Sequence, residues 1–429
     1  MLFVRALPPM FVRITNWKWH LLIIAAAVVA YAPCINNGFI ADDFILLHRI
    51  EILKTQPFYL VEVTPEPFRL TSYLVMGILK GAFGYDYRFF YVVNILLHAI
   101  NGLLLRELAF RLTGKTQIAI TAALLFVVFQ SSHEAVMWIG AMNETLVGFF
   151  VMLTLLMWVR GRYGIALASY SLALISKESA AIVVLIVPIV EIYRGNRNFW
   201  RHYIWLFLPT GIFAAAFLLT LSKNFMVNNG IHAIGWHALV VLPNSIHRLL
   251  WPWSYILIAL LAITKSGGFS KRQVMITAAF LVSVFLPYIF VANTFNVPSR
   301  HNYLASAVLA VALSSMTWQL RPTALRNLFL VSCVTVNVLY LWIRKDADME
   351  RRAAPTTALI DELRNRPPGP VRLIGFEYAL AVDMAKGAAV TLPGWQWNDV
   401  ELIPPADRCA ECTVLTWDRS ARRYVNQPN

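Results

Sequence analysis

The sequence predicts an all-α polytopic membrane protein with about 11 transmembrane helices, and three observations carry that prediction. The first is composition: of 429 residues, 58% are hydrophobic and only 14% are charged. Soluble domains contain about 25% charged residues. The mean hydropathy of +0.59 agrees with a chain that resides in a bilayer. The other two observations are the series of long apolar segments and the distribution of charge between their loops.

A helix needs about 20 mostly apolar residues to cross the hydrocarbon core, and packed neighbours allow shorter ones. Eleven segments meet this criterion, and the fifth and sixth meet it least well. They cover about 19–36, 88–108, 116–132, 143–160, 163–177, 179–194, 202–221, 246–263, 273–292, 303–319 and 326–343. The first follows basic residues like a signal peptide, but no small-residue cleavage site comes after it, so we expect a retained helix.

Lysine and arginine are enriched in cytoplasmic loops. With a cytoplasmic N-terminus every expected inner loop is basic, whereas the acids of the membrane part fall in the outer loops. The odd number of spans then places the C-terminal tail outside. The segment from Arg344 onward has 12 basic and 12 acidic residues, so the net charge of +14 comes from the membrane part. This positive charge reflects the orientation of the chain in the membrane, and no nucleic-acid partner is needed to explain it.

The first outer loop contains two amphipathic stretches, Asp43–Lys54 and Arg69–Phe83. Their helical periodicity predicts two juxtamembrane helices that lie along the interface. Asp42 is placed to cap the first of them.

The chain divides into a membrane domain, 1–343, and a small outer domain, 344–429. Strand-like runs at Val371–Phe376 and Thr413–Trp417 predict an α/β or irregular fold for the outer domain. Cys409 and Cys412 form a CxxC pair in this domain. A local disulfide is favoured over a zinc site, because no second ligand pair follows at zinc spacing.

Nine ionisable residues come from different loops yet all fall on the outer side of the predicted topology. They are Asp42, Asp43, Arg69, Glu134, Glu144, Lys177, Glu178, Arg300 and His301. Charges next to hydrocarbon are costly, which makes these residues candidates for one functional site. The structural alternatives are helix capping for the acids, and snorkelling or ion pairing for the cations. A ring of cations that binds phosphate is the functional alternative.

An ordered set of motifs, "FIADD", "PFRLTSYL", "YVVNILLHAINGLLL", "HEAVMWIGAMNETLVGFF", "LALISKESA" and "SRHNYLAS", covers about 35–311. In this order the motifs resemble the C-type integral membrane glycosyltransferases. Within these the resemblance is to the protein O-mannosyltransferase group, including its tetratricopeptide-containing branch and bacterial relatives. The chain departs from that group at Leu70, where proline is usual, and in lacking tetratricopeptide repeats.

The resemblance implies a hexosyltransferase that moves a sugar from a polyprenyl-phosphate donor to an acceptor hydroxyl outside a bacterial cytoplasmic (inner) membrane, usually with inversion. Asp43 or Asp42 would be the catalytic base. Three cations, Arg69, Lys177 and Arg300, would bind the donor phosphate. The substrate cavity would be lined by Glu134, Glu144, Glu178, His301 and Tyr303.

Other interpretations of the sequence stay open. Two carboxylates and phosphate oxygens would suit a divalent metal, which the sequence does not demand, and no other cofactor is expected. The acceptor can be a protein, a glycan or a lipid. The alternative function is a transporter or lipid flippase, a class that typically has inverted repeats and ionisable groups near the midplane. No internal repeat is found in this sequence.

Overall fold

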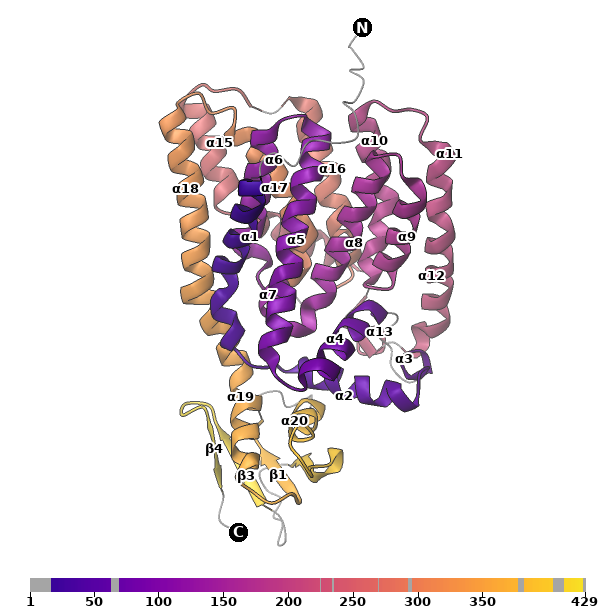
Figure 1. Ribbon diagram of the computed structural model, residues 1–429, viewed down its shortest axis with the longest axis vertical. Helices are drawn as coiled ribbons and strands as arrows, with labels where there is room; N and C mark the ends of the chain where they lie inside the picture. Colours follow the sequence, from indigo (N-terminus) through magenta and orange to yellow (C-terminus); the bar gives the residue numbers. More distant parts are fainter. Residues whose placement is uncertain are drawn as a thin grey trace.

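The computed structural model describes residues 17–62, 69–223, 225–233, 235–268, 270–291, 295–376, 382–403 and 413–426. Long helices run side by side in one bundle, with short helices and a small sheet at one end (Figure 1). We call the end that carries the sheet the tail end. The opposite end, where loops hold Lys115, Arg160 and Arg194, we call the basic end.

The elements have the following bounds. The longer helices of the bundle are α1 (Trp17–Tyr31), α5 (Tyr87–Thr113), α6 (Thr116–Val128), α8 (Met142–Val159), α9 (Tyr163–Leu174), α10 (Val183–Arg194), α12 (Phe207–Thr220), α14 (Ala238–Leu250), α15 (Trp253–Ile263), α16 (Lys271–Phe285), α17 (Tyr303–Thr317) and α18 (Thr323–Tyr340). The other α-helices are α2 (Asp42–Thr55), α3 (Tyr59–Glu62), α4 (Leu70–Phe83), α7 (Glu134–Met137), α11 (Trp200–Tyr203), α13 (Phe225–Asn228), α19 (Asp346–Arg364) and α20 (Val382–Ala389). Short 3₁₀ turns include η3 (Ile139–Ala141), η4 (Glu178–Ile182), η7 (Leu286–Tyr288), η8 (Ser299–Asn302) and η10 (Trp397–Asp399), and η9 (Leu341–Lys345) is a π-helical turn.

Each of the eleven expected spans coincides with helix in the structure, and the eighth falls on the pair α14 and α15. Among the described residues, five helical stretches are long and apolar enough to cross a bilayer: 17–36, 87–113, 139–159, 200–223 and 323–364. The pair α14 and α15, bent by 63°, makes six if it counts as one span. The helical fold is therefore confirmed, and the number of eleven crossings stays a prediction.

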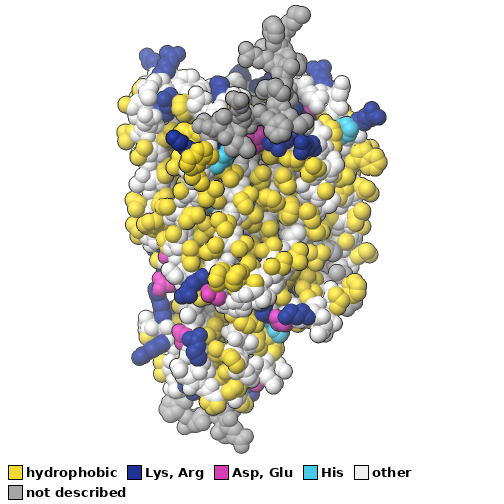
Figure 2. Space-filling view, in the orientation of Figure 1, with side chains coloured by type: hydrophobic (Ala, Val, Ile, Leu, Met, Phe, Trp, Pro, Cys, Tyr) yellow, Lys and Arg dark blue, Asp and Glu magenta, His cyan; other side chains and the backbone are white. Residues whose placement is uncertain are grey.

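Large apolar side chains cover the sides of the bundle. On α12 no side chain is buried, and Leu219 is 82% exposed. Figure 2 shows the hydrophobic side chains as a broad belt between two ends that carry dark blue cations, with the magenta acids mainly toward the tail end. A surface of this extent is stable only in contact with lipid, because exposed apolar patches on soluble proteins are small. The chain is an integral membrane protein.

The two predicted juxtamembrane helices are confirmed as α2 and α4, which lie across the tail end (Figure 1). The predicted cap is wrong. Ala41 occupies the N-cap position of α2 with φ of 45°, and no side chain caps this helix. The turn at Ala41 places Asp42 inside the first helical turn, so it is the next residue, Asp43, whose carboxylate reaches back to the backbone N–H of Ile40.

The tail forms a four-stranded sheet in the order β2-β1-β3-β4. Its strands are β1 (Val371–Ile374), β2 (Val400–Leu402), β3 (Thr413–Asp418) and β4 (Arg423–Asn426). The β1 strand pairs in parallel with β2 and β3, whereas β3 and β4 are antiparallel. Both predicted strand runs are confirmed, while Cys409 and Cys412 lie outside the described residues. Helix α18 continues through η9 into α19, so the expected boundary at 343/344 falls within one continuous helix.

The tail packs against α2. The ring of His48 on α2 stacks on Trp397 with centroids 3.9 Å apart. A Cβ atom added to Gly387 of α20 would lie 3.0 Å from the backbone of Phe44 on α2. Because Phe44 follows Asp43 directly, this contact fixes the segment that carries the buried carboxylate.

We expect Gly387→Ala to destabilise the protein by roughly 1–3 kcal/mol, since the added methyl group overpacks the contact with α2. The thermal midpoint of the detergent-purified protein measures this loss. Gly369→Ala is the matched control in the tail, because nothing lies within 4 Å of a Cβ atom at that position. Equal midpoints for the two variants would contradict tight packing of α20 on α2.

Candidate active site

The centre of the tail-end site is the carboxylate of Asp43, which is fully buried. One oxygen, Oδ2, accepts the N–H of Ile40 at 2.8 Å, and the other, Oδ1, accepts the N–H of Gly140 at 2.5 Å. Glycine is required at position 140, because a Cβ atom there would lie 2.8 Å from Oδ1. The indole N–H of Trp138 donates to the carbonyl of Ile40 at 3.3 Å. The turn around η3 therefore holds Asp43 in one orientation.

Burial raises the pKa of Asp43 well above its ordinary value, although the N–H groups of Ile40 and Gly140 act in the opposite direction. A carboxylate with a raised pKa is a stronger base than an exposed aspartate, which suits it to accept a proton. The neighbouring Asp42 is half-buried. The two neighbouring acids therefore lie in different environments, and of the two only Asp43 is fully buried.

A second group of side chains, the Lys177 cluster, consists of Lys177, Glu144, His301 and Tyr288. Lys177 forms a buried ion pair with Glu144 from the first turn of α8. The Nδ1 atom of His301 lies 2.6 Å from Oε1 of Glu144 and 3.1 Å from Nζ of Lys177. The ring of Tyr288 stacks on His301 with centroids 4.3 Å apart. Burial, followed by the charge of Lys177, lowers the pKa of His301 to about 3, so its imidazole is neutral at pH 7.

Arg69 and Glu178 border the Lys177 cluster. The start of α4 is joined to the loop before η4 by the Thr71 hydroxyl, which donates to the Ser176 hydroxyl at 2.7 Å. Burial alone would raise the pKa of Glu178, but the charges of Arg69 and Lys177 outweigh it and lower that pKa. Arg69, at the N-cap position of α4, therefore places its charge beside that of Lys177.

A third group, the Glu134 cluster, consists of Glu134, Arg300 and Arg352. Oε1 of Glu134 lies 2.8 Å from Nη1 of Arg352, and its Oε2 lies 3.6 Å from Nη1 of Arg300. The backbone N–H of Arg300 also donates to Oε2 at 3.3 Å. Burial alone would raise the pKa of Glu134, but Arg352 and Arg300 lower it to about 2. The guanidinium of Arg300 lies 5.0 Å from the ring of Trp138, which links this cluster to Asp43.

The structure thus brings most of the predicted site residues to the tail end. Asp42, Asp43, Arg69, Glu134, Glu144, Lys177, Glu178, Arg300 and His301 all lie in α2, the loops or the first helical turns there. Tyr303 differs: it is fully buried, and its hydroxyl lies 2.8 Å from Nδ1 of His98 and accepts from Asn101 at 2.9 Å, both on α5. Its predicted contact with substrate stays a prediction.

Sequence reasoning missed four residues of the site. Trp138 and Gly140 stand in the motif "HEAVMWIGAMNE", where a glycine two residues after a tryptophan and before an apolar helix was the available signal. Tyr288 gives no comparable signal. Arg352 lies in the polar helix α19, 218 positions from its partner Glu134, and nothing in its local sequence separates it from the neighbouring Arg351.

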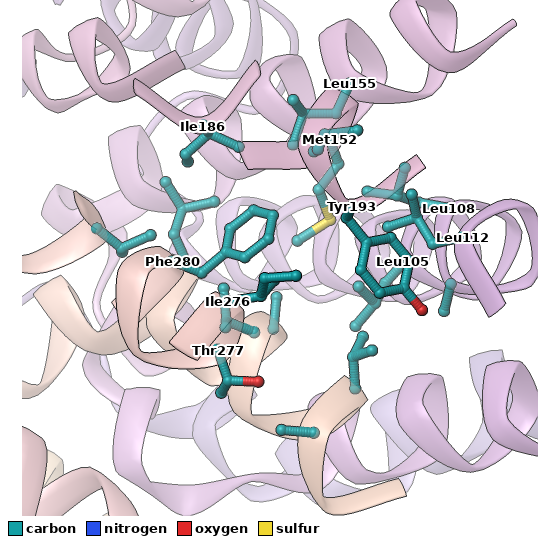
Figure 3. A pocket seen from close by; sticks show the side chains of 18 of the residues that line it. Leu105, Leu108, Leu112, Met152, Leu155, Ile186, Tyr193, Ile276, Thr277 and Phe280 are labelled. Atoms are coloured by element: carbon teal, nitrogen blue, oxygen red, sulfur yellow. The ribbon is translucent and has the colours of Figure 1, made fainter. Parts of the chain in front are cut away.

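An apolar pocket of about 160 Å³ lies between α5, α8, α10, α16 and α17. Figure 3 shows Leu108, Met152, Ile186, Tyr193 and Phe280 turned toward it from four of these helices. Its lining also includes Leu304, three residues beyond His301. The pocket therefore extends within the bundle from the first turn of α17 toward the basic end.

Metal ligands do not gather in the described part of the chain: no three His, Cys, Asp or Glu side chains there lie close enough together to hold an ion. The cations described above at the tail end are Lys177, Arg69, Arg300 and Arg352.

The fold matches that of solved membrane enzymes. ArnT from Cupriavidus metallidurans bound to undecaprenyl phosphate aligns with a TM-score of 0.61 at 12% identity, over 92% of this chain and 87% of ArnT. The Archaeoglobus fulgidus oligosaccharyltransferase in its apo form aligns with a TM-score of 0.50 at 12% identity, over 87% of this chain and 64% of that enzyme. No protein-family model matches the sequence, and no curated protein matches it either. The chain shares the fold of ArnT and of the oligosaccharyltransferase, in agreement with the resemblance of its motifs to the C-type integral membrane glycosyltransferases.

The opposite pKa shifts of Asp43 and Glu134 predict opposite effects of pH on stability. A raised pKa in the folded state means that ionised Asp43 costs stability, increasingly so as pH rises above about 4. A lowered pKa means that Glu134 contributes stability at pH 7, which is lost as pH falls from about 4.5 toward about 2. Thermal midpoints of Asp43→Asn and Glu134→Gln at about pH 4 and pH 8 test this. The midpoint of each variant is taken relative to wild type at the same pH. From the lower to the higher pH this difference should rise for Asp43→Asn and fall for Glu134→Gln. A change of the same sign in both variants would refute the opposite pKa shifts of the two acids.

Proposed function

We propose that this protein transfers a sugar from a polyprenyl-phosphate-linked donor to an acceptor hydroxyl at the tail end, with inversion at the anomeric carbon. The observation that carries the proposal is the buried Asp43 carboxylate, held by backbone N–H groups at the end of the bundle where cations from several loops also lie. The fold it shares with ArnT, solved with undecaprenyl phosphate, supports the choice of donor. The resemblance to the O-mannosyltransferases supports a hexose as the sugar.

In this reaction Asp43 takes the proton of the acceptor hydroxyl as its oxygen attacks the anomeric carbon. The bond from that carbon to the phosphate oxygen breaks, and the polyprenyl phosphate leaves with the electron pair. Because negative charge builds up on the phosphate, cations positioned beforehand lower the barrier. Lys177, Arg69 and Arg300 are the cations that we assign to the phosphate.

The apolar pocket is proposed to hold the prenyl chain. It begins at Leu304, three residues beyond His301 of the Lys177 cluster, and is lined mostly by apolar side chains. If the donor phosphate binds at that cluster, the prenyl chain can extend into the pocket between α16 and α17, toward the basic end. The acceptor, whether protein, glycan or lipid, would then approach Asp43 from the tail side.

We further propose that the tail end faces outward from a bacterial cytoplasmic membrane and that the N-terminus is cytoplasmic. The support is that the loops of the basic end hold Lys115, Arg160 and Arg197, because cytoplasmic loops are enriched in lysine and arginine. The ionisable groups of the site lie at one end of the bundle. Transporters instead place such groups near the midplane, so the geometry favours an enzyme.

Asp43→Asn should lower transfer by at least about 100-fold, because general base catalysis contributes about 10²–10⁴-fold. Transfer of radiolabelled sugar from a polyprenyl-phosphate donor, measured in proteoliposomes, gives the rate. Donor binding should persist, since the amide preserves the shape of the side chain. Asp42→Asn is the matched control and should retain most activity. Normal transfer by Asp43→Asn would remove Asp43 from the proposed role.

Ala307→Phe should raise the KM for the donor, because a phenyl ring at this pocket-lining position takes space proposed for the prenyl chain. The effect should be larger for long-chain donors than for a short prenyl analogue, and comparing KM for the two measures it. Val331→Phe, on the exposed face of α18, is the control. A KM that does not depend on chain length in Ala307→Phe would place the chain elsewhere.

A further inference from the structure

Three polar side chains form a row along one face of α5. Asn94, His98 and Asn101 stand at positions i, i+4 and i+7, a spacing that places them on the same side of a helix. All three are fully buried, in a helix that is long and apolar enough to cross a bilayer. Polar groups buried in this way are costly unless they form hydrogen bonds. We call these three residues the α5 polar row.

Asn94 binds groups that lie next to two buried acids of the site. Its Nδ2 atom donates to the carbonyl of Ala135 at 2.9 Å, and to the next carbonyl along the chain at 3.0 Å. Ala135 follows Glu134 directly. The Oδ1 atom of Asn94 accepts the hydroxyl of Thr145 at 2.6 Å, and Thr145 follows Glu144 directly. One amide group of α5 therefore ties the start of α7 to the first turn of α8.

His98 and Asn101 hold the hydroxyl of Tyr303. Nδ1 of His98 lies 2.8 Å from this oxygen, and Nδ2 of Asn101 donates to it at 2.9 Å. The same Nδ2 atom donates to the carbonyl of Thr145 at 2.8 Å, and Nε2 of His98 lies 3.2 Å from the carbonyl of Val127. Because a carbonyl can only accept, we assign the ring proton to Nε2, so Nδ1 accepts from the Tyr303 hydroxyl. This hydroxyl thus donates once and accepts once, which fixes its direction.

Tyr303 transmits this restraint to η8. It is the first residue of α17 and comes directly after the turn that holds Arg300 and His301. Its ring packs closely on α8, because a Cβ atom added to Gly148 would lie 2.5 Å from Cε1 of that ring. Figure 1 shows α5 beside α8 in the bundle. The α5 polar row therefore restrains η8 as well as α7 and α8.

We propose that the α5 polar row positions the Glu134 cluster and the Lys177 cluster relative to each other, acting through Thr145 and Tyr303. This inference rests on the proposed function, in which cations of both clusters bind the donor phosphate. Charges that stabilise a phosphate must be in place beforehand, and a displacement of about 1 Å can cost about 100-fold in rate. The row acts through hydroxyl and carbonyl groups next to the clusters, so its members are positioning residues and not catalytic residues.

Thr145→Val tests the row, because valine keeps the shape of threonine and removes the hydroxyl that Asn94 accepts. Thr154→Val is the matched control: Thr154 is equally buried on α8, and its hydroxyl donates at 2.7 Å to the carbonyl of Phe150 in the same helix. The full-length proteins, in phosphatidylcholine nanodiscs, are titrated with undecaprenyl phosphate. Thr145→Val should raise the Kd about tenfold, whereas Thr154→Val should leave it within about twofold of wild type. Thr145→Ser, which restores the hydroxyl, should recover most of the affinity.

The dissociation constant separates positioning from folding. A variant that folds less well has fewer binding sites, but the sites that remain keep the Kd of wild type. Binding stoichiometry and the thermal midpoint are therefore measured beside the Kd. Equal Kd values for Thr145→Val and Thr154→Val, while wild type binds, would overturn the inference and leave the proposed function standing. Failure of wild type to bind undecaprenyl phosphate would contradict the proposed function and, with it, the inference.

A second position gives an independent test, which decides the question if Thr145→Val does not fold. Tyr303→Phe keeps the ring and removes the hydroxyl held by two members of the row, so it should also raise the Kd. Ser314→Ala is its control on the same helix, since it removes a buried hydroxyl that donates to the carbonyl of Ile118 at 2.7 Å. Because Asn101 joins Tyr303 to Thr145, the double variant should raise the Kd by less than the product of the two single increases. Increases that multiply would show that the two positions act separately, and would overturn the row as one unit.

Discussion

Burial of the Asp43 carboxylate at the membrane boundary is the constraint on which the tail end depends. A buried carboxylate is costly unless hydrogen-bond donors surround it. Here the donors are backbone N–H groups of Ile40 and Gly140, so the approach to α2 and the turn at η3 must both be fixed. The tail strengthens this arrangement, because α20 packs on Phe44 directly after Asp43.

The other buried charges at the tail end also have partners that offset the cost of their burial. Lys177 and Glu144 come from different elements and meet in a buried ion pair, and Glu134 holds arginines from η8 and α19. Buried pairs of this kind contribute little net stability, since desolvation offsets their attraction. The proposed function accounts for their retention at one end of an apolar bundle, because these pairs would preorganise cations and a base where a phosphate-linked sugar reacts.

Much of this could be predicted from the sequence, and the failures have physical causes. The periodicity of 43–54 and 69–83 predicted α2 and α4, and the outer-loop charges marked the site residues. The sequence could not tell which aspartate turns inward, because the turn at Ala41 decides it. The number of eleven crossings stays a prediction, since several helices on the expected spans have fewer than 18 residues, among them α6, α9, α10, α16 and α17. Arg352 was missed because its contact with Glu134 depends on tertiary folding, which local pattern does not encode.

Mass spectrometry of the lipids that copurify with the protein tests the central claim most directly, comparing wild type with Asp43→Asn. The account predicts a glycosylated polyprenyl monophosphate, enriched in the variant because donor binds but is not consumed. The mass of that lipid would also identify the class of sugar. Absence of any such lipid from both proteins, while they remain folded and retain other lipids, would contradict the account and favour a transporter.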